Sequence, residues 1–222
     1  MRDPNPHHTT NPGYPFVAVS IGMAVRGRPV LGIIFLPVLE EMYVAWREGG
    51  ATRNGRPIRV GRAASVGEAL LMNNIGSNRS WAFVDRTLYR LKRLLHGHQL
   101  QGLRNSGSAA VNLAHVASGK LDVYFEDGVG GPWDWAAGQV LVEEAGGVLV
   151  GLRGEAVELT LGKKGKLVAG NATVVGDVVK RLQGADRRYL MHRSYDVVAL
   201  VSTLYVGGRL LLVAVEAARR RK

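Results

Sequence analysis

Strand-like and helix-like segments alternate through the middle of this chain, and glycines separate them. The small-residue segment 109–118 has helical spacing, and Gly119 ends it before an apolar, strand-like run at 121–125. The helix-like segment 133–145 is closed in the same way by two glycines. This alternation predicts an α/β domain built in layers. The other elements expected in this part are strands at 69–75, 148–152 and 166–169 and helices at 81–95 and 173–182.

The first third of the chain has a different pattern. Short apolar runs at 16–25, 30–36 and 42–46 are separated by turn-forming residues, which predicts an antiparallel meander. Residues 1–13 are polar and proline-rich, without the apolar core of a secretory leader. We therefore expect a cytoplasmic protein, and a plastid location stays open.

The charge of the chain is strongly basic, at +11. Residues 183–222 contain eight basic and three acidic residues, so this segment contributes +5. No nucleic-acid-binding motif is recognisable in the remainder, and a basic chain end is most often solvated. We expect no nucleic-acid partner. The chain also has no cysteine, which excludes disulfides, thiolate metal sites and cysteine nucleophiles.

An apolar stretch at 197–215 barely reaches the length of a membrane span. Arg209 interrupts it, and an arginine inside a bilayer is costly. A packed hairpin or a poorly ordered appendage is therefore expected in preference to a membrane segment.

Three segments of the α/β part contain candidate functional residues. Gly107, Ser108 and Ala109 open a predicted helix, where free N–H groups can bind an anion, although a serine there can also be an ordinary N-cap. Asp134 follows two glycines at another predicted helix start, where it can bind a hard cation or merely cap the helix. Glu126 and Asp127 are expected at the end of a strand, in a position suited to a polyol or simply exposed.

Together these segments resemble the inositol monophosphatase family, which consists of magnesium-dependent, lithium-sensitive phosphatases of small sugar phosphates. The resemblance runs from about Tyr14 to Leu182, and its most specific part is the Trp-Asp followed by Glu-Ala-Gly-Gly. It implies a layered αβαβα sandwich of the sugar-phosphatase type and a homodimer. The Gly-Gly-Pro-Trp-Asp form is most similar to plant-type members acting on inositol 1-phosphate and L-galactose 1-phosphate. The matching stretches are YPFVAVSIGMAV, GGATRNGRPIRV, LRNSGSAAVNLAHVASGKLDVYFE and GGPWDWAAGQVLVEEAGGVLV.

The resemblance also implies residue roles. Asp134 would bind Mg²⁺ and the substrate, and Glu126 would hold a sugar hydroxyl. Glu126 is chosen over Asp127 on the assumption that the loop to Asp134 is one residue longer than in animal members. The chemistry would be attack of a metal-activated water on phosphorus. The residues expected to line the substrate are Gly107, Ser108 and Ala109.

The chain departs from the family at its N-terminal side. No Gly-Glu-Glu loop precedes Tyr14, and the family's Asp-Pro-x-Asp-Gly-Thr-Thr-Asn motif is present only as fragments within 3–11. The resemblance assigns Asp3 as a metal ligand and Thr9 as a catalytic residue only through these fragments of the motif. The adjacent His7 and His8 suit a softer metal than Mg²⁺ or are simply solvent-exposed.

These departures lead us to expect a partial family domain at 1–182, lacking its N-terminal part, and a basic extension at 183–222. The predicted function is Mg²⁺-dependent hydrolysis of a small sugar or inositol phosphate. Two alternatives stay open. One is an impaired family remnant that binds phosphate or pairs with an intact relative, and the other is a nucleic-acid binder. Loss of the family's first helices would also leave an apolar sheet face exposed, which favours aggregation or association.

Overall fold

The computed structural model describes residues 14–76, 78–160 and 164–204, with side chains through Met191. Asp3, Thr9, His7 and His8 lie outside these residues. The chain divides into two compact units, residues 1–183 and 184–222. The helix α4 (Ala172–Leu204) includes the boundary between them, so it extends well beyond the helix predicted at 173–182.

The first sheet is the predicted antiparallel meander. Its strand order is β1-β2-β3-β4-β5, and a tight turn at Arg26 and Gly27, both with positive φ, joins the first two strands. Asn54 and Gly55 form a similar turn between the last two strands. The bounds are β1 (Val19–Val25), β2 (Arg28–Leu36), β3 (Glu41–Trp46), β4 (Gly50–Arg53) and β5 (Arg56–Pro57).

The second sheet is mixed, with the order β7-β6-β8-β10-β9. Strand β6 runs parallel to both β7 and β8, whereas β10 is antiparallel to β8 and β9. The parallel pairs require crossovers, which the helices α1 (Trp81–His98) and α2 (Ala109–Ala117) supply. The strands are β6 (Leu70–Asn74), β7 (Gly102–Arg104), β8 (Val123–Val129), β9 (Val148–Val150) and β10 (Gly165–Gly170).

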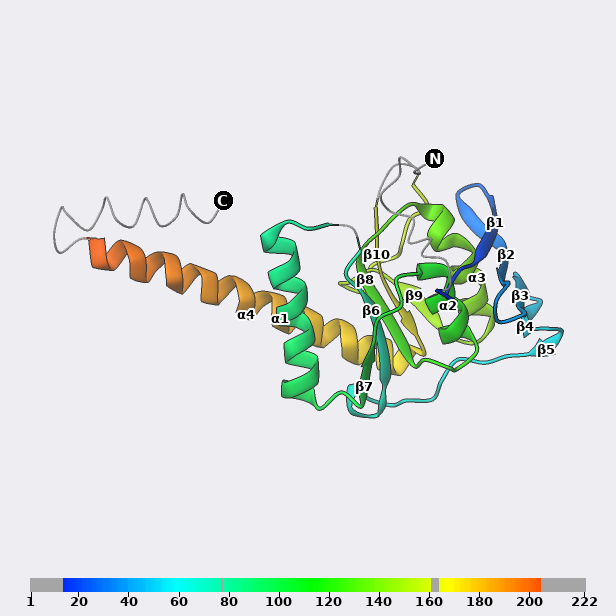
Figure 1. The fold of residues 1–222 in the computed structure, drawn as a ribbon, viewed down its shortest axis with the longest axis horizontal. Coiled ribbons are helices and arrows are strands. Elements are labelled where there is room, and N and C mark those ends of the chain that lie inside the picture. The colour runs from blue at the N-terminus through cyan, green and yellow to red at the C-terminus, as the bar shows by residue number, and fades with distance from the viewer. Residues whose placement is uncertain (1–13, 77, 161–163, 205–222) are drawn as a thin grey trace. The chain divides into compact units, whose positions relative to one another are not determined.

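Both faces of the second sheet are covered, and this determines the layers (Figure 1). The helices α2 and α3 (Ala136–Glu144) fill the space between the two sheets, and α1 with the first turns of α4 covers the opposite face. The α/β sandwich predicted from the sequence is confirmed. Alternate residues of the sheet enter two cores: Met72, Tyr124, Leu167 and Ala169 pack toward α2 and α3, and Leu71, Val123, Phe125 and Val168 pack toward α1 and α4.

Two local predictions are wrong. The segment at 133–145 begins as a 3₁₀ turn, η2 (Pro132–Asp134), and becomes α-helical only at Ala136. Strand β8 continues to Val129, so Glu126 and Asp127 lie inside a strand and not at its end. Because adjacent strand residues point to opposite faces of a sheet, the side chains of these two acids must lie in different surroundings.

None of the helices in the described part of the chain is long and apolar enough to cross a membrane. The part of the 197–215 stretch that is described, up to Leu204, continues α4 as a helix. The rest of the expected hairpin lies outside the described residues.

The outer face of the first sheet is apolar, and within the described ranges no helix covers it. Ile21 and Met23 are each more than half exposed. The register pairs Ile21 with Ile33 and Ile33 with Val44, so apolar side chains line up across three strands. The large apolar side chains exposed on this face are Val19, Ile21, Met23, Val25, Met42 and Trp46. An apolar sheet face of this kind favours aggregation or association.

An Ile21→Lys substitution should therefore suppress aggregation of the isolated chain without unfolding it. A half-exposed position tolerates the change within about 0.5 kcal/mol, whereas Ile34→Lys on the fully buried inner face should unfold the domain. Light scattering against protein concentration, with thermal unfolding alongside, checks both variants. Unchanged scattering in a folded Ile21→Lys variant would contradict the prediction.

Candidate functional site

The start of α2 presents unbonded backbone N–H groups. Ser108 is the N-cap, and its hydroxyl accepts a hydrogen bond from the Val111 N–H at 3.4 Å. No described residue accepts from the N–H groups of Ala109 and Ala110, which lie at the positive end of the helix. This arrangement can bind an anion such as a phosphate group.

Gly107 precedes this helix with a φ of +88°, a conformation that favours glycine. Its N–H donates to Oδ1 of Asn74 at 3.0 Å. The N–H of Gly107 is therefore bonded within the protein, and the role of Gly107 in lining the substrate stays a prediction. Its contribution to the site is the shape of the loop before α2.

Glu126 lies on the face of β8 that packs toward α2. It is buried at 5% exposure, and the Tyr124 hydroxyl donates a short hydrogen bond to its Oε2. Burial raises the pKa of the Glu126 carboxyl, and the negative charge of Asp134 raises it further. The two carboxyl groups thus interact.

Asp127 faces the opposite side of β8, toward α1. Its Oδ2 contacts Arg90 at 2.7 Å and Arg86 at 3.1 Å, and its Oδ1 contacts Lys166 at 3.3 Å. Burial alone would raise the pKa of Asp127, but the hydrogen bond and charge of Arg90, with the other two cations, lower it. Asp127 is committed to these ion pairs and is turned away from Glu126.

Asp134 ends the 3₁₀ turn, and its carboxylate folds back onto the preceding loop. The Gly131 N–H donates to Oδ2 at 3.2 Å. A Cβ at Gly130 would lie only 2.2 Å from the same oxygen, so a larger residue there would displace the Asp134 carboxylate from this position. The glycines before Asp134 therefore let its carboxylate approach the loop that leads away from β8.

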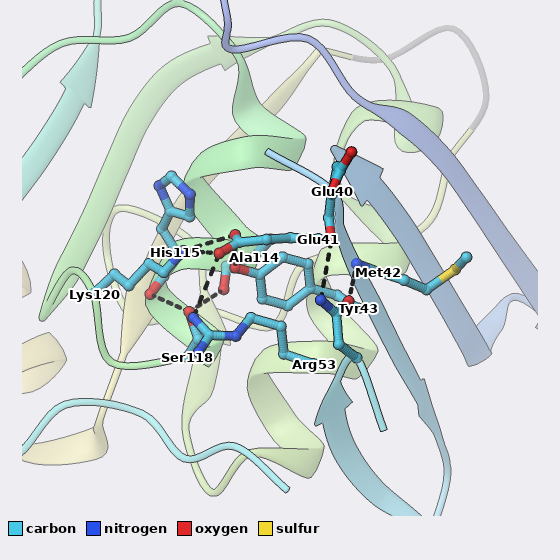
Figure 2. Close-up of polar contacts among 10 residues, drawn as sticks. Glu40, Glu41, Met42, Tyr43, Arg53, Ala114, His115, Ser118 and Lys120 are labelled. Carbon is cyan, nitrogen blue, oxygen red and sulfur yellow. Dashed lines mark hydrogen bonds and ion pairs between the residues drawn. The ribbon is translucent and has the colours of Figure 1, made fainter. Parts of the chain in front are cut away.

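The opposite end of α2 is fixed by a polar network on the first sheet (Figure 2). The Glu41 carboxylate accepts from Lys120 Nζ at 2.5 Å and from the Tyr43 hydroxyl at 2.7 Å. Burial and Glu41 raise the pKa of Tyr43 to about 12. His115 lies beside this network, and burial with the charge of Lys120 lowers its pKa to about 4, so its ring is neutral at pH 7. The network supports the C-terminal end of α2.

The described part of the chain brings together few side chains that could bind a metal ion. Within residues 14–76, 78–160 and 164–191, no group of three or more His, Asp or Glu side chains is placed to hold a metal ion. Glu126 and Asp134 are two carboxylates that interact electrostatically, and Glu126 already accepts a hydrogen bond from the Tyr124 hydroxyl. Mg²⁺ needs about six oxygen ligands. The described residues alone therefore do not provide enough oxygen ligands for Mg²⁺.

Asn74 is the site residue that sequence reasoning missed. It lies at the end of β6, faces the same side as Glu126, and bonds to the loop before α2. The signal in the sequence was two asparagines at the end of a predicted strand, since buried amides at such positions usually have defined hydrogen-bond partners.

The two-sheet sandwich with α2 and α3 between the sheets is the layered α/β fold of the sugar-phosphatase type. Residues 11–186 match the family model of the inositol monophosphatase family. The chain belongs to this family.

Named relatives agree with this assignment. The chain is 42% identical to inositol monophosphatase 2 of Solanum lycopersicum over 67% of its own length and 55% of that protein. It is 39% identical to an inositol-1-monophosphatase of Synechocystis over 68% of its length and 51% of that protein. The structure of an inositol monophosphatase from Anabaena (Nostoc) superposes with a TM-score of 0.66 at 34% identity, covering 77% of this chain and 68% of that one. The chain thus spans about half the length of these two curated relatives.

Proposed function

We propose that this chain binds a small polyol phosphate, inositol 1-phosphate or L-galactose 1-phosphate, and that phosphomonoester hydrolysis is its reaction. One observation carries the proposal. Residues that are distant in the sequence are linked on one face of the second sheet. The Gly107 N–H donates a hydrogen bond to Asn74, and Asn74 is the register partner of Glu126. The negative charge of Asp134 in turn raises the pKa of Glu126. The names of the relatives support an inositol phosphate as the ligand.

In this proposal different residues bind different parts of the ligand. The N–H groups of Ala109 and Ala110 and the hydroxyl of Ser108 bind the phosphate at the positive end of α2. Glu126 accepts a hydrogen bond from a ring hydroxyl, and Asp134 holds the hydroxyl or ester oxygen beside the phosphate. A hydroxyl donor facing Glu126 would favour its charged form, which offsets part of the effect of burial.

The resemblance implies Mg²⁺, but the described carboxylates do not fit it, so we assign no step to a metal. Hydrolysis by this chain would require oxygen ligands outside the described residues. Asp3 and Thr9 remain the candidates within the chain for metal binding and catalysis, respectively.

The alternative is binding without turnover, alone or paired with an intact relative. The small carboxylate set favours it, because a hard cation bound by so few ligands is held weakly. The two functions share the ligand site and differ only in phosphate release.

An Asp134→Asn substitution separates these functions. We expect it to weaken binding of inositol 1-phosphate about tenfold, since a hydrogen bond to a charged group contributes about 1.5 kcal/mol. Calorimetry without metal measures binding, and phosphate release with added Mg²⁺ measures turnover. Asp85→Asn, on the exposed side of α1, is the matched control and should change neither.

The outcomes discriminate clearly. Release by the unmodified chain that Asp134→Asn abolishes would support hydrolysis. Binding with release at background in both proteins would support the non-catalytic alternative. If the unmodified chain binds no inositol 1-phosphate, the proposed function is wrong.

A further inference from the structure

Asn74 occupies a buried position between two parts of the site. It is 4% exposed and ends β6, where its Cα is the register partner of Glu126 on the parallel strand β8. Neighbouring residues at equivalent register point to the same face of a sheet. The Asn74 side chain therefore lies beside the Glu126 carboxyl.

The two ends of the Asn74 amide have different partners. Oδ1 accepts the Gly107 N–H at 3.0 Å. The amide also interacts with the Glu126 carboxyl and the Tyr124 hydroxyl, where it offsets part of the rise in pKa that burial causes at both groups. A carboxylate can only accept hydrogen bonds, so the NH₂ end of the amide must face it. The partners thus define the orientation of the amide.

Neither aspartate nor leucine at position 74 would provide both interactions. An aspartate at position 74 could still accept from Gly107 but would place a second negative charge against Glu126. A leucine would satisfy neither partner and would leave the Gly107 N–H and part of the buried carboxyl without hydrogen bonds.

We propose that Asn74 is a positioning residue that fixes the start of α2 relative to Glu126, and that it thereby selects a polyol phosphate over inorganic phosphate. The ligand in this statement rests on the proposed function. A polyol phosphate must contact the helix start with its phosphate and Glu126 with a hydroxyl at the same time, so its binding depends on their separation. Inorganic phosphate contacts only the helix start.

The neighbouring Asn73 is a matched control. It is also an asparagine of β6, with 1% exposure, but it points to the opposite face and its Nδ2 donates to the Phe125 carbonyl at 2.9 Å. Asn73→Leu and Asn74→Leu make the same chemical change at adjacent buried positions. Only the second removes the link between Gly107 and Glu126.

The experiment has one arm that needs no ligand. Amide hydrogen exchange of the Gly107 N–H, followed by NMR in the full chain, should accelerate at least tenfold in Asn74→Leu and stay unchanged in Asn73→Leu. Asn74→Asp should keep most of the protection, because its carboxylate still accepts from Gly107. Thermal unfolding of all variants ensures that exchange is compared in folded protein.

The second arm measures dissociation constants for inositol 1-phosphate and for inorganic phosphate. Asn74→Leu and Asn74→Asp should weaken inositol 1-phosphate binding at least tenfold. Asn74→Leu should weaken inorganic phosphate less than threefold, so the selectivity ratio falls, whereas Asn73→Leu should keep the ratio.

The two arms separate the possible failures. Unchanged Gly107 exchange in folded Asn74→Leu would overturn the positioning role, whatever the ligand result. Altered exchange with an unchanged selectivity ratio would overturn the role in selection. If the unmodified chain does not bind inositol 1-phosphate, the proposed function and the selection fail, while the exchange arm still decides the positioning role.

Discussion

Asp127→Asn should lower the free energy of unfolding by about 3 kcal/mol, since removing one partner of a buried ion pair leaves an uncompensated charge. Arg90 loses its buried ion pair in this variant, because its side chain is only 4% exposed and contacts Asp127 at 2.7 Å. Lys166 and Arg86 are more exposed and depend less on this carboxylate. Chemical denaturation at pH 7 measures the change.

The adjacent acid supplies the contrast. Glu126→Gln should keep or slightly increase stability at pH 7, because the pKa of Glu126 is raised and its charged form is unfavourable in the fold. The same change should weaken inositol 1-phosphate binding. Equal loss of stability in both variants would contradict the assignment of the two acids to different faces.

The pH dependence of stability follows from the lowered pKa of Asp127. A carboxyl whose folded pKa is below its unfolded value binds fewer protons in the fold, so its contribution is fully present above the unfolded pKa of about 3.9. It is lost as the pH falls through the folded pKa. The stability difference between the unmodified chain and Asp127→Asn should therefore shrink under acid conditions.

Gly32→Ala should destabilise the domain by about 3 kcal/mol, because the added Cβ has no space and overpacking distorts a close contact. On β2, a Cβ at Gly32 would lie 2.3 Å from the Ala137 carbonyl oxygen of α3. The clashing atoms belong to the backbone of α3, which cannot change rotamer as a side chain can, so the added Cβ must push α3 away from the sheet. Because α3 begins just after Asp134, binding of inositol 1-phosphate should weaken as well.

Gly176→Ala in α4 is the matched control. A Cβ there meets nothing within 4 Å, so replacing a helical glycine should stabilise by up to about 1 kcal/mol. Thermal and denaturant unfolding compare the two variants. A Gly32→Ala protein as stable as the unmodified chain would show that the sheet and α3 can separate without cost.

Much of the fold could be predicted from local pattern. Turn residues around Arg26 and Asn54 mark the meander, and glycines at 119 and 146 mark the ends of helices that the structure also ends there. The prediction was less accurate where a 3₁₀ turn replaced the first turn of a helix at Pro132. Proline and two glycines before Asp134 favour such a turn, because proline fixes φ and glycine permits the tight approach of the carboxylate.

By itself, the sequence determined the layered α/β class, the family resemblance and the segments that contain the candidate residues, because turns, helical periodicity and signature motifs are local. The tertiary structure decided which of the two adjacent acids faces the start of α2. Strand β8 is buried on both faces, so its residues show no polar–apolar alternation from which to read the phase. The tertiary structure also decided that Asn74 contacts Gly107 and that Gly32 contacts Ala137. Such contacts depend on how strands pair and helices pack, so the spacing of residues along the chain does not predict them.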